Sequence, residues 1–162
     1  MKVKEGRWIE GWKTSVMDFA GTEYEEYLFF SQEELLQILK ENMSKIDHDW
    51  EWYTKSGERF GTNYERSHPD LSYVYGRSLD KHLALSWILR YKMINQQRFI
   101  HQALIPEKQS QLRRQLTDIL QGGSIFSYTE ILELFPEVEA ELVLDDLIES
   151  GQLDQYLNKR RK

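Results

Sequence analysis

Histidine is the side chain best suited to proton transfer near neutral pH, and this chain has four of them. No two of them form the HExxH pattern in which helical histidines hold a zinc ion. His48 lies between Asp47 and Asp49, an arrangement that could bind a metal or place a base beside its orienting carboxylate. His68 precedes Asp70 in a proline-containing segment. A small enzyme with a site near His48 or His68 is therefore one hypothesis, while two solvated turns are the simpler interpretation.

Other patterns that mark catalysis are missing from the sequence. The chain has no cysteine, which excludes a thiol nucleophile, a disulfide and a zinc site of the thiolate type. There is no glycine-rich phosphate loop and no G-x-S-x-G elbow. The sequence therefore favours a protein that is not an enzyme, names no catalytic residue, and predicts neither a metal nor a cofactor.

Aromatic residues are concentrated before residue 78. A ligand pocket on a predicted sheet would be lined by these side chains together with the two histidines: Trp8, Trp12, Trp50, Trp52, His48 and His68. The alternative is that the tryptophans form the core between that sheet and a helix over 31–46. The placement of Trp8 and Trp12 at a period of two, as on one face of a strand, fits this second interpretation.

The expected fold class is α+β, with an aromatic β-rich N-terminal half. Alternating patterns predict strands over 8–16 and 50–54, an apolar run predicts one over 24–30, and a turn at Ser56-Gly57 predicts one over 59–64. The sequence Ser31 to Glu34 is a capping box that begins the helix over 31–46. We therefore divide the chain into a β-rich α+β subdomain (1–77), a connecting central helix (78–106) and a helical unit with a basic tail (107–162).

The C-terminal unit resembles a winged helix in the order of its elements. Helices are predicted over 107–121, 127–135 and 137–150, with short strands at 124–126 and 153–157, and the stretch LIESGQLDQY is similar to the end of the third helix and the next strand of such domains. In DNA-binding winged helices the third helix enters the major groove. Here that helix has six carboxylates and no Lys, Arg, Asn or Gln, so it would repel DNA.

Four of these carboxylates are spaced four residues apart on the third helix: Glu137, Glu141, Asp145 and Glu149. Like charges at this spacing repel, so a basic group nearby would relieve the helix. It could come from the C-terminal residues 159–162, from the basic helices of 78–121, or from another molecule. The last source predicts that the acidic helix docks a protein partner with a basic surface, or the basic tail of a second copy.

Charge is unevenly distributed along the chain, whose formal net charge is −6. The leading hypothesis is a non-catalytic binding or regulatory protein of the cytoplasm with no membrane segment, because no leader-like or membrane-spanning run is present. The alternative is a nucleic-acid-associated accessory factor whose anion contacts come from basic helices and the basic tail: Arg90, Arg98, Arg113 and Arg114.

Overall fold

The computed structural model describes residues 15–60, 69–101 and 105–160, and the side chains of 15–48, 79–101 and 105–158. The elements within these ranges are two short 3-10 helices and six α-helices, in the order η1 (Val16–Phe19), η2 (Glu25–Phe29), α1 (Gln32–Phe60), α3 (Pro69–His101), α4 (Pro106–Gln121), α5 (Tyr128–Leu134), α6 (Val138–Glu149) and α7 (Asp154–Arg160). No β-strand occurs in these ranges, so the described part of the protein is all-α and the predicted α+β class is wrong.

The β-rich N-terminal half is the largest error of the sequence prediction. Residues 8–14 lie outside the described ranges, but Val16–Phe19 and Glu25–Phe29 are 3-10 helices. Ser15 begins the first of them with a capping box, in which its hydroxyl accepts from Met17 and the Asp18 carboxylate accepts from the Ser15 amide. The sequence Ser15 to Asp18 has the spacing of that motif, so the local signal for a helical turn was present.

Helix α1 includes the first of the two later segments predicted as strands, and the beginning of the second. It includes residues 50–54 and ends at Phe60, while residues 61–64 lie outside the described ranges. The alternation over 50–54 involved only three residues, too few to interrupt a helix already formed over about five preceding turns. Gly57 within α1 costs about 1 kcal/mol relative to alanine, which a helix of this length tolerates.

Helix α3 begins earlier than the predicted central helix. Its first residue is Pro69, a position where proline is favourable because its fixed φ suits the helix and its missing N–H has no intrahelical partner. Residues 69–76, which the sequence analysis placed in the β-rich subdomain, are therefore helical. In the described residues, no helix combines the length and apolar character needed to cross a bilayer.

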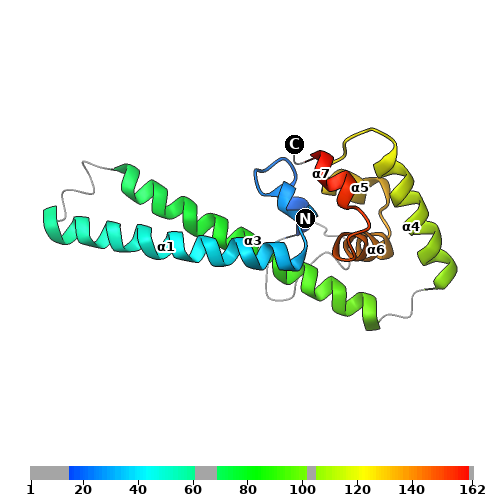
Figure 1. Ribbon diagram of the computed structural model, residues 1–162, viewed down its shortest axis with the longest axis horizontal. Helices are drawn as coiled ribbons and strands as arrows, with labels where there is room; N and C mark the ends of the chain where they lie inside the picture. The colour runs from blue at the N-terminus through cyan, green and yellow to red at the C-terminus, as the bar shows by residue number, and fades with distance from the viewer. Residues whose placement is uncertain (1–14, 61–68, 102–104, 161–162) are drawn as a thin grey trace. The chain divides into compact units, whose positions relative to one another are not determined.

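The chain forms two compact units. The second unit is Glu33–Trp87, in which Figure 1 shows α1 and the beginning of α3 alongside each other in opposite directions. The first unit combines the chain up to Gln32 with Ile88–Lys162. It contains η1, η2, the end of α3, and α4 to α7, so the candidate sites below all lie within it.

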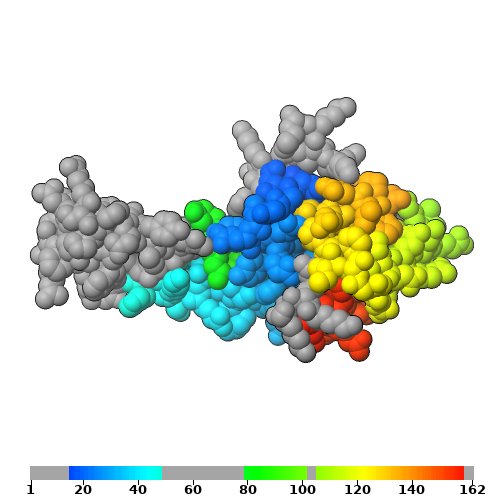
Figure 2. Space-filling model, turned by 90° about the horizontal axis from the view of Figure 1, so that it is seen from above, coloured from blue at the N-terminus to red at the C-terminus, as the bar shows by residue number. Residues whose placement is uncertain are grey.

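Helices α4, α5 and α6 confirm the three helices that the sequence predicts over 107–121, 127–135 and 137–150, with bounds that differ by at most one residue at each end. Ser127 caps α5, accepting from the Glu130 amide while the Glu130 carboxylate accepts from the Ser127 amide. Helix α6 ends before Gly151, whose φ of 78° is the left-handed conformation expected after a helix. Figure 2 shows the N-terminal turns, in blue, next to the C-terminal helices, and α5 contacts both η1 and η2.

The two strands expected in this unit do not form. Residues 124–126 have no regular structure, and the segment predicted as a strand over 153–157 is mostly helix α7. Leu153, Tyr156 and Leu157 are buried, and their spacing of three and four residues is that of a helix face rather than a strand. The resemblance to a winged helix depended on the order of helices and strands, and only its three helices are present in the described residues.

Candidate functional site

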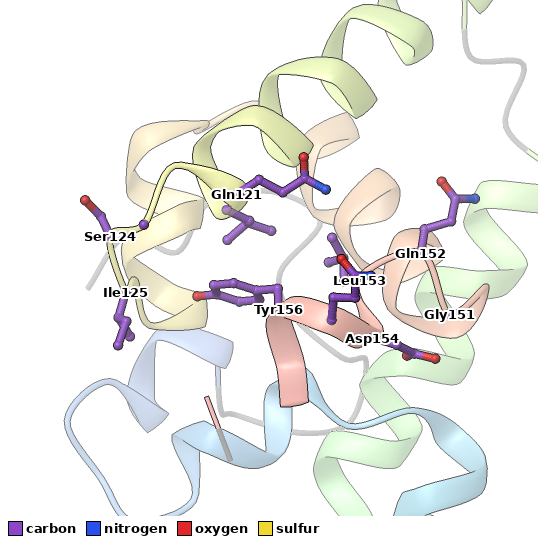
Figure 3. Close-up of a pocket in the computed structure, with 11 residues that line it drawn as sticks. Gln121, Ser124, Ile125, Gly151, Gln152, Leu153, Asp154 and Tyr156 are labelled. Carbon is purple, nitrogen blue, oxygen red and sulfur yellow. The ribbon is translucent and has the colours of Figure 1, made fainter. Parts of the chain in front are cut away.

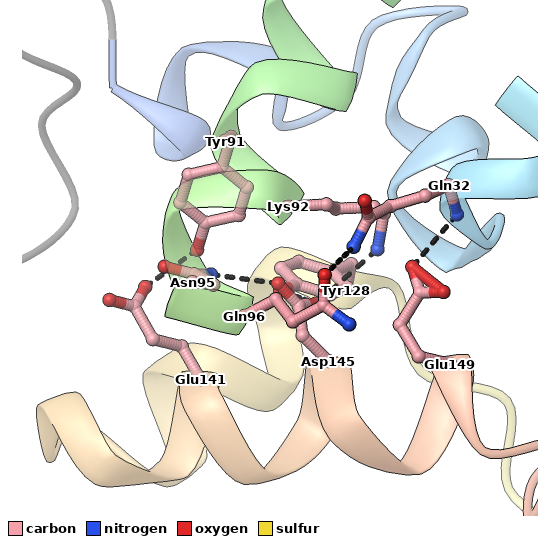
Figure 4. A network of polar contacts seen from close by, with 9 residues as sticks. All are labelled: Gln32, Tyr91, Lys92, Asn95, Gln96, Tyr128, Glu141, Asp145 and Glu149. Carbon is pink, nitrogen blue, oxygen red and sulfur yellow. Dashed lines mark hydrogen bonds and ion pairs between the residues drawn. The ribbon is translucent and has the colours of Figure 1, made fainter. Parts of the chain in front are cut away.

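Two acidic residues of α6 are buried in the core of the first unit. Glu141 has an exposed fraction of 0% and Asp145 one of 4%, and both side chains point from α6 toward α3 (Figure 4). Polar side chains of α3 meet them there, including Lys92, which is 1% exposed. Buried charges of this kind are stable only when they are paired and hydrogen-bonded.

Asp145 is the centre of this buried polar network. Its carboxylate accepts hydrogen bonds from the Tyr128 hydroxyl at 2.6 Å and the Asn95 side-chain amide at 2.7 Å. The Lys92 ammonium group lies 3.3 Å from Oδ1 of the same carboxylate. Three donors from α3 and α5 therefore converge on one side chain of α6, and they join the three helices.

Glu141 lies one helical turn before Asp145 and has its own donors. It accepts from the Tyr91 hydroxyl at 2.6 Å, and the Arg98 guanidinium lies 3.4 Å from its other oxygen. Burial, with the Glu141 and Asp145 charges next, raises the pKa of Tyr91 well above its usual value. The pKa of Tyr128 is also raised, first by burial and then by the charge of Asp145. Both hydroxyls therefore stay protonated and serve as donors.

Further charges of α6 are paired at its edges. Arg113 of α4 forms an ion pair with Asp146, and Lys108 of α4 lies 3.5 Å from Glu139. Among the sources of basic charge considered from the sequence, the structure thus uses the helices of 78–121. Basic side chains of α3 and α4 therefore neutralise acidic side chains of α6 within the same chain.

The four residues predicted to bind a partner have different environments. Glu141 and Asp145 are buried, so they do not form a surface that a partner could reach. Glu149 is half-buried and accepts a hydrogen bond from the Gln32 amide at 2.8 Å, and burial raises the pKa of its carboxyl. Glu137 is exposed at the start of α6. The structure therefore does not bring the predicted acidic stripe together at the surface.

The residues of the predicted aromatic pocket are mostly outside the described part. This holds for Trp8, Trp12 and His68, and for the side chains of Trp50 and Trp52, whose backbone belongs to α1. His48 is exposed on α1. Among the described residues, no group of three His, Cys, Asp or Glu side chains has an arrangement that could hold a metal ion.

The four arginines proposed as anion contacts divide into two pairs. Arg98 and Arg113 are engaged with Glu141 and Asp146, so their charge is partly compensated within the protein. Arg90 on α3 and Arg114 on α4 are exposed.

An open cleft of about 700 Å³ lies where α4 ends and α7 begins, and the sequence analysis did not predict it (Figure 3). We call it the α4–α7 cleft, and it is lined by Leu120, Gln121, Gly123, Ser124, Ile125, Gly151, Gln152, Leu153, Asp154, Gln155 and Tyr156. The Tyr156 ring extends toward the 124–126 loop, where its hydroxyl donates to the Phe126 carbonyl at 3.2 Å. This bond fixes one wall of the cleft.

The lining of the α4–α7 cleft is chemically mixed. Its side chains include three primary amides, from Gln121, Gln152 and Gln155, beside the apolar side chain of Ile125, which is 74% exposed. Asp154 contributes a carboxylate, and the described lining residues include no lysine, arginine or histidine. The sequence signal for this site was the pair of helix-ending glycines, Gly123 and Gly151, both with positive φ. Comparison of the chain with protein-family models, curated proteins and solved structures found no match.

Proposed function

We propose that this is a non-catalytic binding protein that holds a short segment of a protein partner in the α4–α7 cleft. The observation that carries the proposal is the cleft itself, which combines an exposed isoleucine with three side-chain amides around an open space of about 700 Å³. Amide groups can both donate to and accept from a peptide backbone, and an exposed apolar side chain offers an anchoring contact. The cytoplasmic location predicted from the sequence remains part of this proposal.

The proposed contact surface is the α4–α7 cleft and not the acidic face of α6. Glu141 and Asp145 have their charges matched by Lys92 and Arg98, so they hold α3, α5 and α6 together and leave the cleft on a fixed framework. A binding site with a rigid frame loses less entropy when it takes up its partner. The buried network supports binding by fixing the helices rather than by touching the partner.

A random dodecapeptide library displayed on phage tests the proposal directly. The full chain is the bait, and selected peptides are then synthesised and measured by fluorescence anisotropy. We expect peptides whose affinity for Ile125→Asp is at least about tenfold weaker, because a carboxylate replaces the exposed apolar contact. The matched control is Leu134→Asp, which changes an apolar residue of α5 that is 52% exposed and does not line the cleft. Equal loss in both variants, or in neither, would contradict the proposal.

A further inference from the structure

The C-terminal end of α4 forms one wall of the α4–α7 cleft and lacks a backbone cap. Helix α5 ends with a bond from the Phe135 amide to the Ile131 carbonyl, and α6 with one from the Ser150 amide to the Asp146 carbonyl. In the described residues, no backbone N–H outside α4 returns to a carbonyl of residues 118–121. The last-turn carbonyls of a helix carry partial negative charge, so the cleft wall at Gln121 offers acceptors.

Basic residues that usually offset a helix C-terminus are missing from the last turns of both α4 and α6. From residue 124 to residue 156 the sequence has nine acidic residues and none that are basic. Asp154 is exposed on the side of the cleft opposite Gln121 (Figure 3). Its place in the first turn of α7 also offsets the partial positive charge at the start of that helix. The end of α4 and the Asp154 carboxylate therefore bring negative charge to two sides of the cleft, and none of the described residues that line it is basic.

We infer that the segment bound in the α4–α7 cleft is a basic peptide, with a lysine or arginine against the C-terminal carbonyls of α4 and its neighbouring residues toward Asp154. This inference rests on the proposed function and specifies the chemistry of the partner. The alkyl part of a lysine or arginine side chain suits the apolar surface of Ile125, while its charged group reaches the carbonyls. The partner charge that the sequence suggested for α6 thus acts at the helix ends around the cleft.

The substitution Gln121→Lys tests the inference at the end of α4. A lysine there would occupy the position of the partner's cation and repel it, so we expect the affinity for a basic peptide selected from the library to fall by about tenfold. The same lysine complements the helix end, so the urea midpoint should stay equal or rise. Loss of binding together with preserved stability separates a charge effect from misfolding.

The matched control is Gln111→Lys, which adds the same charge at an exposed position of α4. It lies ten residues before Gln121, or about 15 Å along the helix axis, so it should change the affinity by less than about twofold at 150 mM salt. Asp154→Asn tests the other side of the cleft, where we expect about fivefold weaker binding. Equal effects of Gln121→Lys and Gln111→Lys would overturn the inference.

The peptides themselves separate this inference from the proposed function. Replacing each lysine of a selected peptide by norleucine, or each arginine by citrulline, keeps the side-chain length and removes the charge. We expect one such replacement to lose most of the affinity. Cleft-dependent peptides that are not basic, or that bind equally well after replacement, would overturn the inference and leave the proposed function standing. A library that yields no cleft-dependent peptide would overturn both.

Discussion

Replacing Lys92 by methionine should destabilise the first unit strongly, because methionine keeps the apolar length of lysine but removes the charge opposite Asp145. The two groups are 3.3 Å apart, and their side chains are 0% and 5% exposed. At an effective dielectric constant of about 20, unit charges at this distance attract by about 5 kcal/mol. Breaking one partner of a buried pair usually costs about 3–5 kcal/mol. Asp145 keeps its bonds from Tyr128 and Asn95, so we expect a loss near about 3 kcal/mol.

Urea unfolding followed by circular dichroism at pH 7 measures this loss. Domains of this size are stable by about 5–15 kcal/mol, so the midpoint should shift clearly while the slope stays constant. The control Arg114→Met removes an exposed charge from α4 and should change the free energy of unfolding by less than about 0.5 kcal/mol. A loss below about 1 kcal/mol for Lys92→Met would show that water already compensates the pair, and would refute the buried network as a structural frame.

The double variant Lys92→Met with Asp145→Asn supplies a second check on the same reasoning. Asparagine can still accept from Tyr128 but carries no charge, so the double variant should be more stable than Lys92→Met alone. The free energies of the two single changes should therefore not add. Strict additivity would mean that the two side chains do not interact.

Three further changes test other contacts. Burial tends to raise the pKa of Glu25, but hydrogen bonds from Thr129 and Gly21 outweigh this effect and lower the pKa below its ordinary value. The ionised carboxylate therefore stabilises the fold at neutral pH, and this stabilisation is lost as the pH falls through the lowered pKa. Glu25→Gln should thus cost about 1 kcal/mol at pH 7, after allowance for partial exposure, and less below pH 4.5 in urea titrations at each pH. The pH dependence at Glu149 has the opposite direction, because burial raises the pKa of its carboxyl, and the folded state loses stability as the pH rises through that raised pKa. Glu149→Gln should therefore be at least as stable as the wild type at pH 7 and have no advantage below pH 4.5. A lower stability of this variant at pH 7 would contradict the reasoning. Gly151→Ala should lower the melting temperature by about 2–4 °C in thermal scans, because φ at this residue is 78° and the added Cβ would lie 3.2 Å from the Asp154 carboxylate. An unchanged melting temperature would contradict the claim that alanine strains the backbone at this position.

Local motifs explain which parts of the fold were predictable. Helix α5 follows from the Ser127 capping box, and the end of α6 follows from Gly151, because in both cases a few neighbouring atoms decide the structure. The strands near residues 16 and 50 were predicted from alternation alone, which a short aromatic-rich helix produces equally well. Length was the better guide, since an alternating run of three residues carries little information against a long helix.

The site depended on contacts between residues far apart in the sequence. Lys92 and Asn95 interrupt an otherwise apolar face of α3, and Glu141 and Asp145 interrupt one of α6. The sequence analysis assigned Glu141 and Asp145 to an acidic partner-binding stripe and did not single out Lys92 or Asn95. Only the contacts between α3 and α6 show that the two pairs compensate each other. Polar residues three or four positions apart on the apolar faces of two helices were therefore the signal for a buried network. The α4–α7 cleft had no comparable signal beyond its glycines, because its walls come from three separated helix ends.

Neutralisation of the buried acidic residues of α6 also determines which negative charges of the protein can attract a partner. Asp145 and Glu141 are screened from solvent and opposed by Lys92 and Arg98, so their field outside the protein is small compared with that of exposed charges. The C-terminal end of α4, at the α4–α7 cleft, has no basic residue in its last turn. A cationic ligand would therefore be drawn to the cleft rather than to the helix with the most carboxylates. Charge reversal at Glu139, whose partner Lys108 lies outside the cleft, should therefore leave peptide affinity nearly unchanged, while Gln121→Lys lowers it about tenfold.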